Sequence, residues 1–112
     1  IETLDFDPCY VKHLADSAGT SICLDIGHLI KFGRPVNETA LRWSDAVRVL
    51  HVHGVMPDGT DHRDLSYIDP ELYRSVSSMM SHGKERVMTL EVFEGDYDRS
   101  LEAIKNMFPD IV

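Results

Sequence analysis

The sequence predicts an α/β fold in which parallel strands alternate with helices. Four short apolar segments, at 1–4, 21–25, 47–53 and 86–93, are each followed by residues with polar or helical patterning. Strands joined through helices pair in parallel by right-handed crossovers. The chain has 112 residues, of which 43% are hydrophobic, which is enough for one packed core and too short for two domains.

The first two predicted strands lead into segments with clear helix signals. A helix is predicted over 8–18, because Asp7 suits an N-cap and the apolar residues after it recur at helical spacing. The second strand leads into 27–33, which we interpret as a loop or a short helix. A helix over 37–44 follows, with Asn37 as its N-cap.

The last two strands are separated by a long polar segment. Residues 54–69 form a predicted loop, and loops of this length in compact domains are usually functional or disordered. A helix is predicted over 70–81, with Asp69 as its N-cap. The final predicted helix covers 97–108, after the fourth strand.

Composition excludes several classes of partner. The formal net charge of −8 argues against nucleic acid bound through phosphates and against an anionic membrane surface. No apolar run approaches the ~20 residues of a membrane span. Two cysteines, Cys9 and Cys23, cannot form a disulfide framework, so we expect a cytoplasmic protein. Because Ile1 is not methionine and already lies in a predicted strand, we expect the chain to be a piece of a longer protein.

Each predicted strand carries an acid or an imidazole in an apolar segment. These residues are Glu2, Asp25, His51 and Glu91. Ligands of parallel α/β folds bind beyond the carboxyl ends of the strands, and an ionised group among apolar residues is costly unless it is paired or bound to a cation. Carboxylates and imidazole suit Mn, Zn, Mg or Co as divalent ions. Each residue also has a structural interpretation: exposure for Glu2, an N-cap for Asp25, a core position for His51 and a pair with Arg48 for Glu91.

Four short motifs resemble those of a known superfamily. The motifs are Ile-Glu-Thr-Leu (1–4), Leu-Asp-Ile-Gly-His (24–28), Leu-His-Val-His-Gly (50–54) and Leu-Glu-Val-Phe (90–93). They resemble strands five to eight of the xylose-isomerase-like TIM barrels, which include sugar isomerases, sugar epimerases and phosphodiesterases of the AP-endonuclease type. The resemblance implies that 1–112 is a single segment, the C-terminal half of a (β/α)8 TIM barrel with four parallel βα units. It also implies that the four strand residues form the metal quartet of that superfamily.

The segment Gly-Thr-Asp-His-Arg-Asp-Leu (59–65) resembles the phosphodiesterase branch more narrowly. In that branch an aspartate and a histidine, usually one residue apart, bind an additional metal. Here Asp61 and His62 are adjacent, so the resemblance assigns His62 and leaves Asp61 open. Together the motifs look most like cobamide-remodelling phosphodiesterases, which cleave the phosphoester of the corrinoid nucleotide loop. Arg63, through its planar fork, and His53 are the expected substrate contacts.

Three functional hypotheses follow. The first is divalent-metal-dependent phosphodiester hydrolysis, with Glu2, Glu91 and His28 as catalytic residues and with His28 and His62 at a further metal. The second is a sugar or sugar phosphate isomerase or epimerase with one metal, in which Glu2 and Glu91 bind the metal and exchange protons. The third is a non-catalytic half-barrel fragment that self-associates, since a complete barrel takes ~250 residues. For the same reason the first two activities are expected of an intact barrel and not of this segment alone. Open sheet edges would then favour a homo-oligomer.

Overall fold

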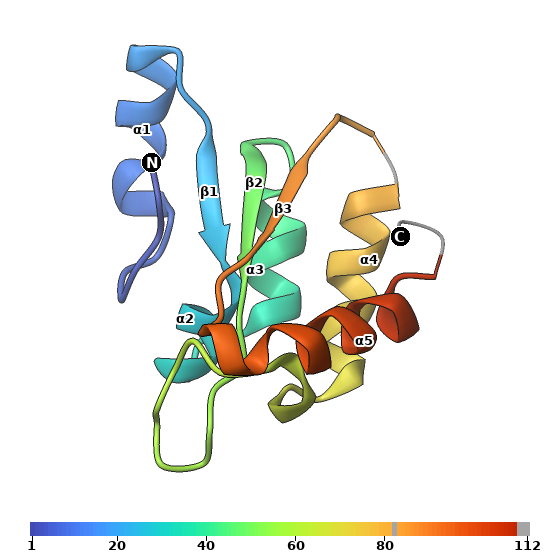
Figure 1. Cartoon of the computed structure of the whole chain (residues 1–112). Helices are drawn as coiled ribbons and strands as arrows, with labels where there is room; N and C mark the ends of the chain where they lie inside the picture. Colours follow the sequence, from blue (N-terminus) through green and yellow to red (C-terminus); the bar gives the residue numbers. More distant parts are fainter. Residues whose placement is uncertain (82, 110–112) are drawn as a thin grey trace.

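The computed structural model describes residues 1–81 and 83–109 (Figure 1). The α-helices are α1 Cys9–Ala18, α2 Ile26–Lys31, α3 Val36–Trp43, α4 Tyr73–Ser81 and α5 Tyr97–Met107. The strands are β1 Ile22–Asp25, β2 Val47–Val52 and β3 Val87–Leu90. Three 3₁₀ turns are also present within these described ranges: η1 Leu65–Tyr67, η2 Pro70–Leu72 and η3 Glu94–Asp96.

The three strands form one parallel sheet in the order β1-β2-β3. Figure 1 shows α3 behind β2 and β3, with α4 beside it and α5 crossing the end of the sheet to which the strands lead. The register pairs Asp25 of β1 with His51 of β2, and His51 with Thr89 of β3. The predicted α/β class with parallel strands is confirmed, and the sheet brings two of the predicted site residues side by side.

The first predicted strand is reduced to a single bridge. Glu2 pairs in parallel with Cys23, where the Thr3 N–H donates to the Cys23 carbonyl (3.0 Å) and the Cys23 N–H donates to the Ile1 carbonyl (2.8 Å). Ile1 and Leu4 are exposed, so little apolar burial supports a longer strand here. The described residues form three strands and one bridge, so the four predicted βα units are not shown, although the bridge still sets Glu2 beside β1.

An apolar core fills the space between the sheet and the helices. Leu24 and Leu50 on the strands, Ile26 in α2 and Val76 in α4 have no exposed surface. The buried apolar residues of β1 and β2 alternate along each strand, as the pleat requires, so that one face of the sheet is turned toward the helices. They are Ile22 and Leu24 in β1, and Leu50 and Val52 in β2. None of the described helices is long and apolar enough to cross a membrane.

Several predicted helix boundaries shift. The helix α1 begins at Cys9, whose N–H donates to the Asp7 carboxylate (2.8 Å), with Pro8 at the N-cap position. The helix α3 begins at Val36, one residue before the predicted cap, because Pro35 provides the extended residue that precedes it. The predicted cap Asp69 does accept a hydrogen bond, from Glu71 N–H at 2.9 Å, but it caps the 3₁₀ turn η2 rather than α4. The strand β3 is also shorter than the predicted 86–93.

Candidate metal centre

Four segments bring Glu2, Asp25, His51 and Glu91 together. Asp25 ends β1, His51 lies opposite it in β2, and Glu91 follows β3, where its N–H donates to the Val52 carbonyl (3.0 Å). One potential ligand atom from each of the four residues lies within 4.8 Å of the other three. The sequence-predicted quartet is therefore assembled, at the end of the sheet where ligands of parallel α/β folds bind.

The imidazole of His51 stands among the three carboxylates. Its Nδ1 lies 3.2 Å from Glu2 Oε1, 3.1 Å from Glu91 Oε1 and 3.9 Å from Asp25 Oδ2. One imidazole carries at most one positive charge, so three carboxylates around it leave an excess of negative charge. A divalent cation fits this excess, and the oxygen and nitrogen donors are those that Mn, Zn, Mg and Co accept.

Asp25 is the buried member of the quartet. Its side chain has no exposed surface, and its Oδ1 accepts from the His28 N–H at 2.8 Å. The other oxygen, Oδ2, has no hydrogen-bond partner among the described residues, although His28 Nδ1 is 3.2 Å away. Burial tends to raise the pKa of Asp25, but hydrogen bonds from His53 and from the His28 backbone outweigh it, so the pKa lies below its usual value. An ionised, unpartnered carboxylate oxygen is the feature that a bound cation would satisfy.

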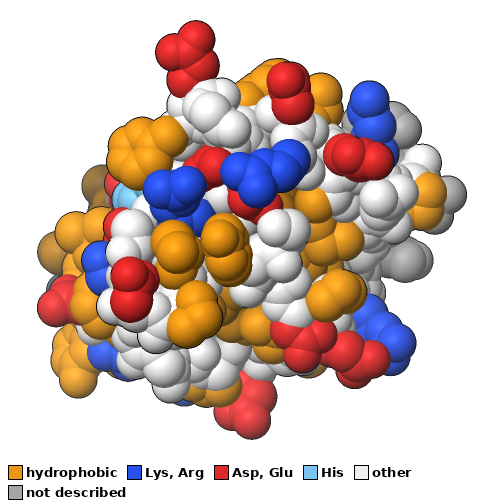
Figure 2. Space-filling model, turned by 60° about the horizontal axis from the view of Figure 1, so that its bottom comes forward, with side chains coloured by type: hydrophobic (Ala, Val, Ile, Leu, Met, Phe, Trp, Pro, Cys, Tyr) orange, Lys and Arg blue, Asp and Glu red, His pale blue; other side chains and the backbone are white. Residues whose placement is uncertain are grey.

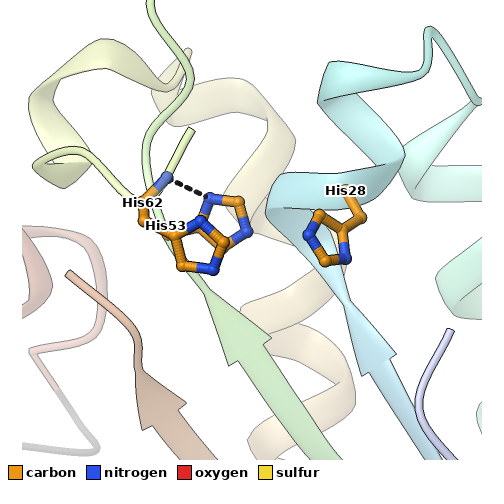
Figure 3. A group of neighbouring side chains, drawn as sticks. All are labelled: His28, His53 and His62. Atoms are coloured by element: carbon orange, nitrogen blue, oxygen red, sulfur yellow. Dashed lines mark hydrogen bonds between the residues drawn. The ribbon is translucent and has the colours of Figure 1, made fainter. Parts of the chain in front are cut away.

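Three further histidines gather beside the quartet (Figure 3). The rings of His53 and His62 are stacked, with centroids 4.2 Å apart and planes 7° from parallel. His28, from α2, lies 5.8 Å from the His62 ring between centroids. His28 Nδ1 is 3.2 Å from Asp25 Oδ2 and His62 Nε2 is 3.8 Å from Glu91 Oε2, so both residues border the quartet as expected.

Asp61, which the sequence left open, lies in this second cluster. Its carboxylate is 3.2 Å from His62 Nδ1 and 3.9 Å from His28 Nε2. Lys31 Nζ donates to it at 2.7 Å. The hydrogen bond from Lys31, with a smaller contribution from His62, lowers the pKa of Asp61 to about 2. The cluster thus already contains one cationic group, the Lys31 ammonium.

The two predicted substrate contacts, His53 and Arg63, are engaged within the protein. His53 has no exposed surface, and its Nε2 lies 3.1 Å from Asp25 Oδ1. Arg63 Nε lies 2.8 Å from Asp96 Oδ2, and Asp96 is buried at the start of α5. Their expected roles as substrate contacts gain no support, because both polar ends face protein groups. The sequence reasoning missed Asp96, since nothing in the residues Glu-Gly-Asp marks that aspartate as buried.

A hollow of about 320 Å³ opens beside the quartet. It is lined by His62, Leu90, Glu91, Val92 and Phe93. Figure 2 looks at the end of the molecule with α5 and the long loop, and shows Lys and Arg side chains interspersed with Asp and Glu, with hydrophobic side chains between them. No continuous basic surface is visible on this face.

The chain has no match among protein-family models, curated proteins or solved structures. The resemblance to xylose-isomerase-like barrels therefore stays a prediction from the four motifs, and the geometry of the site carries the functional argument.

Proposed function

We propose that the chain contributes the metal centre of a divalent-metal-dependent phosphodiester hydrolase. The observation that carries this proposal is the convergence of Glu2, Asp25, His51 and Glu91, with the unpartnered Oδ2 of Asp25 among them. The adjacent cluster of His28, His62 and Asp61 supports a phosphoryl substrate in particular, because a phosphodiester needs additional cationic or hydrogen-bonding groups next to the metal.

The residues of the chain divide into binding and orienting roles. The quartet would hold a divalent ion, which when bound polarises a phosphoryl group and acidifies water. His62 is the most accessible imidazole of the second cluster, at 36% side-chain exposure, and it lines the hollow beside Glu91. It would donate a hydrogen bond to a phosphoryl oxygen of a substrate in that hollow. His28 is more enclosed and would hold Asp61 and the quartet in place.

One observation favours the second candidate, a sugar or sugar phosphate isomerase or epimerase with one metal. Lys31 already pairs with Asp61, so the second cluster has less need of a metal of its own. Glu2 and Glu91 would then bind the single metal and exchange protons at carbons next to a carbonyl. The number of ions bound and the activity on a ketose distinguish the two candidates.

The test uses the 112-residue chain, and any longer protein that contains it, with Zn²⁺ or Mn²⁺ and a general phosphodiester, bis(p-nitrophenyl) phosphate. We expect metal-dependent hydrolysis that the Glu91→Gln variant loses and that the Glu102→Gln variant, changed at an exposed position of α5, retains. A corrinoid with an intact nucleotide loop is the second substrate, because the motifs resemble enzymes that cleave it. Hydrolysis that Glu91→Gln leaves unchanged, or conversion of a ketose without any hydrolysis, would overturn the proposal.

A further inference from the structure

His53 touches both clusters but faces neither solvent nor the hollow. Its side chain is fully buried, between Asp25 of the quartet and the backbone of His62. Nε2 lies within ion-pair distance of Asp25 Oδ1, at 3.1 Å, and has no partner with full hydrogen-bond geometry among the described residues. On the opposite side of the ring, Nδ1 accepts a hydrogen bond from the His62 backbone N–H at 3.1 Å (Figure 3), and the Gly54 carbonyl oxygen lies 3.4 Å from the same nitrogen.

The shorter contact of Nδ1 indicates which nitrogen of His53 carries the proton. The His62 N–H at 3.1 Å requires the Nδ1 lone pair, whereas the longer contact with the Gly54 carbonyl, at 3.4 Å, would require a proton there. With the Nδ1 lone pair directed at His62, the proton of the neutral ring lies on Nε2. That proton points to the side of the ring on which Asp25 Oδ1 lies. The opposite tautomer would place a nitrogen lone pair against a carboxylate in a buried site, which is unfavourable. One ring nitrogen each of His28, His53 and His62 lies within 4.8 Å of the other two, so these histidines could themselves hold a metal ion. In the inferred tautomer the lone pair of His53 is directed at the His62 N–H instead.

Two backbone features hold the ring in this orientation. Gly27 lies against it, and a β-carbon at that position would be 2.1 Å from Cε1 of His53. His62 has a φ of 56°, the left-handed conformation that few residues other than glycine adopt, and in this conformation its N–H meets Nδ1. The missing side chain of Gly27 leaves room for the His53 ring, and the His62 N–H binds it.

The opposite oxygen of Asp25 gains from this arrangement. Oδ1 accepts a hydrogen bond from the His28 N–H (2.8 Å) and lies 3.1 Å from His53 Nε2. Oδ2 has no hydrogen bond among the described residues and lies 3.2 Å from His28 Nδ1 and 3.9 Å from His51 Nδ1. A rotation that exchanges the two oxygens would break both contacts of Oδ1. Oδ2 is therefore presented to the quartet.

We propose that His53 is a positioning residue: as the Nε2–H tautomer it holds Oδ1 of Asp25 and so aims Oδ2 at the cation of the quartet. The consequence for metal binding rests on the proposed function, whereas the tautomer and the contact with Asp25 do not. Groups that orient a metal ligand by contacting its atoms that do not bind the metal commonly raise the affinity for the metal 10–100-fold.

The first test measures Zn²⁺ affinity by calorimetry in variants of the 112-residue chain. His53→Leu, which removes the donor, is expected to bind about 10–100-fold more weakly, and His53→Gln, whose amide keeps one donor and one acceptor, should recover part of the loss. His13→Leu makes the same change at an exposed position of α1 and should bind as the unchanged chain does. A folded His53→Leu variant with undiminished affinity would overturn the positioning role.

The second test needs no substitution and no metal. A long-range ¹H–¹⁵N correlation spectrum reports which imidazole nitrogens carry protons, and we expect His53 Nε2 to be protonated. A lone pair on Nε2 would refute the proposed tautomer even if His53→Leu failed to fold. If the unchanged chain binds no Zn²⁺, the metal centre of the proposed function fails, while this spectrum still decides whether His53 donates to Asp25.

Discussion

Glu91→Gln should stabilise the metal-free chain and at the same time remove most of its stabilisation by a divalent ion. In the folded chain the carboxylates of Glu2, Asp25 and Glu91 have oxygens within 4.8 Å of one another, around the single imidazole of His51. Glutamine keeps the shape of Glu91 but removes its charge, and with it two of the three repulsive carboxylate pairs.

The size of the effect follows from Coulomb's law. Two unit charges 4.8 Å apart repel by about 0.9 kcal/mol in water and by about 3.5 kcal/mol at an effective dielectric constant of 20. Glu2 and Glu91 are partly exposed, so the lower figure applies to their pair, and the lost contact with His51 offsets part of the gain. We expect a net gain of about 1 kcal/mol in the metal-free state, which corresponds to roughly 4 °C in a domain of this size.

The metal should reverse this order of stability. An ion present at 100 times its dissociation constant stabilises the unchanged chain by about 2.7 kcal/mol. The Glu91→Gln variant has one anionic ligand fewer and should gain much less at the same ion concentration. Thermal unfolding followed by circular dichroism, with EDTA and then with Zn²⁺, measures both states.

Glu102→Gln is the matched control, because it removes the same charge from an exposed position of α5. Its unfolding temperature should follow that of the unchanged chain with and without the ion. If Glu91→Gln lowered the metal-free unfolding temperature and still gained as much from Zn²⁺, the repulsion argument and the ligand role of Glu91 would both be refuted.

Three further substitutions test the surroundings of the quartet. The pKa of Asp61 is about 2 in the folded chain, against a usual 3.8, so ionised Asp61 stabilises the chain fully above about pH 4 and loses this effect as the pH falls toward 2. The free energy of unfolding of Asp61→Asn, measured with urea across this range, should therefore fall less with pH than that of the unchanged chain. Gly27→Ala should destabilise the chain by about 1–3 kcal/mol, because the added β-carbon overpacks against the His53 ring. Gly95→Ala is the control, because a β-carbon there meets nothing within 4 Å. Equal unfolding midpoints for the two variants would contradict the contact geometry. Asp96→Asn should destabilise the chain by about 1–3 kcal/mol in urea unfolding, because it leaves Arg63 and Arg99 without the charge of their buried partner; an unchanged midpoint would show that these pairs contribute no net stability.

The strand residues of the quartet were predictable because of their backbone positions. Asp25, His51 and Glu91 stand at or just after the ends of parallel strands, and parallel strands end at the same edge of a sheet. Their convergence follows from topology, which alternating apolar and helical segments already indicate. Glu2 converges with them even though its strand is only a bridge, because one pair of hydrogen bonds beside β1 is enough to set its direction.

The surrounding groups were less predictable, because their roles depend on partners far away in the sequence. Arg63 has the chemistry of a phosphate contact, but whether it meets a phosphate depends on Asp96, 33 residues later. His53 lies two residues from His51 and has the same side chain, yet it is turned away from the hollow. Along a strand, residues two apart share a face, but His53 has left the strand, which ends at Val52.

The burial of His53 shows how the fold can build a precise site from few residues. A buried imidazole is costly unless both of its nitrogens are satisfied, and here one group of the chain lies next to each, Asp25 on one side and the His62 backbone on the other. Losing either partner would leave a polar atom without compensation, so the three groups fix one another's orientation. Because Asp25 ends β1 and His62 lies in the long loop, the same imidazole joins the rigid sheet to that loop. The geometry of the quartet and the conformation of the loop are thereby linked, so substitutions in the loop that displace the His62 N–H should weaken metal binding without touching a ligand.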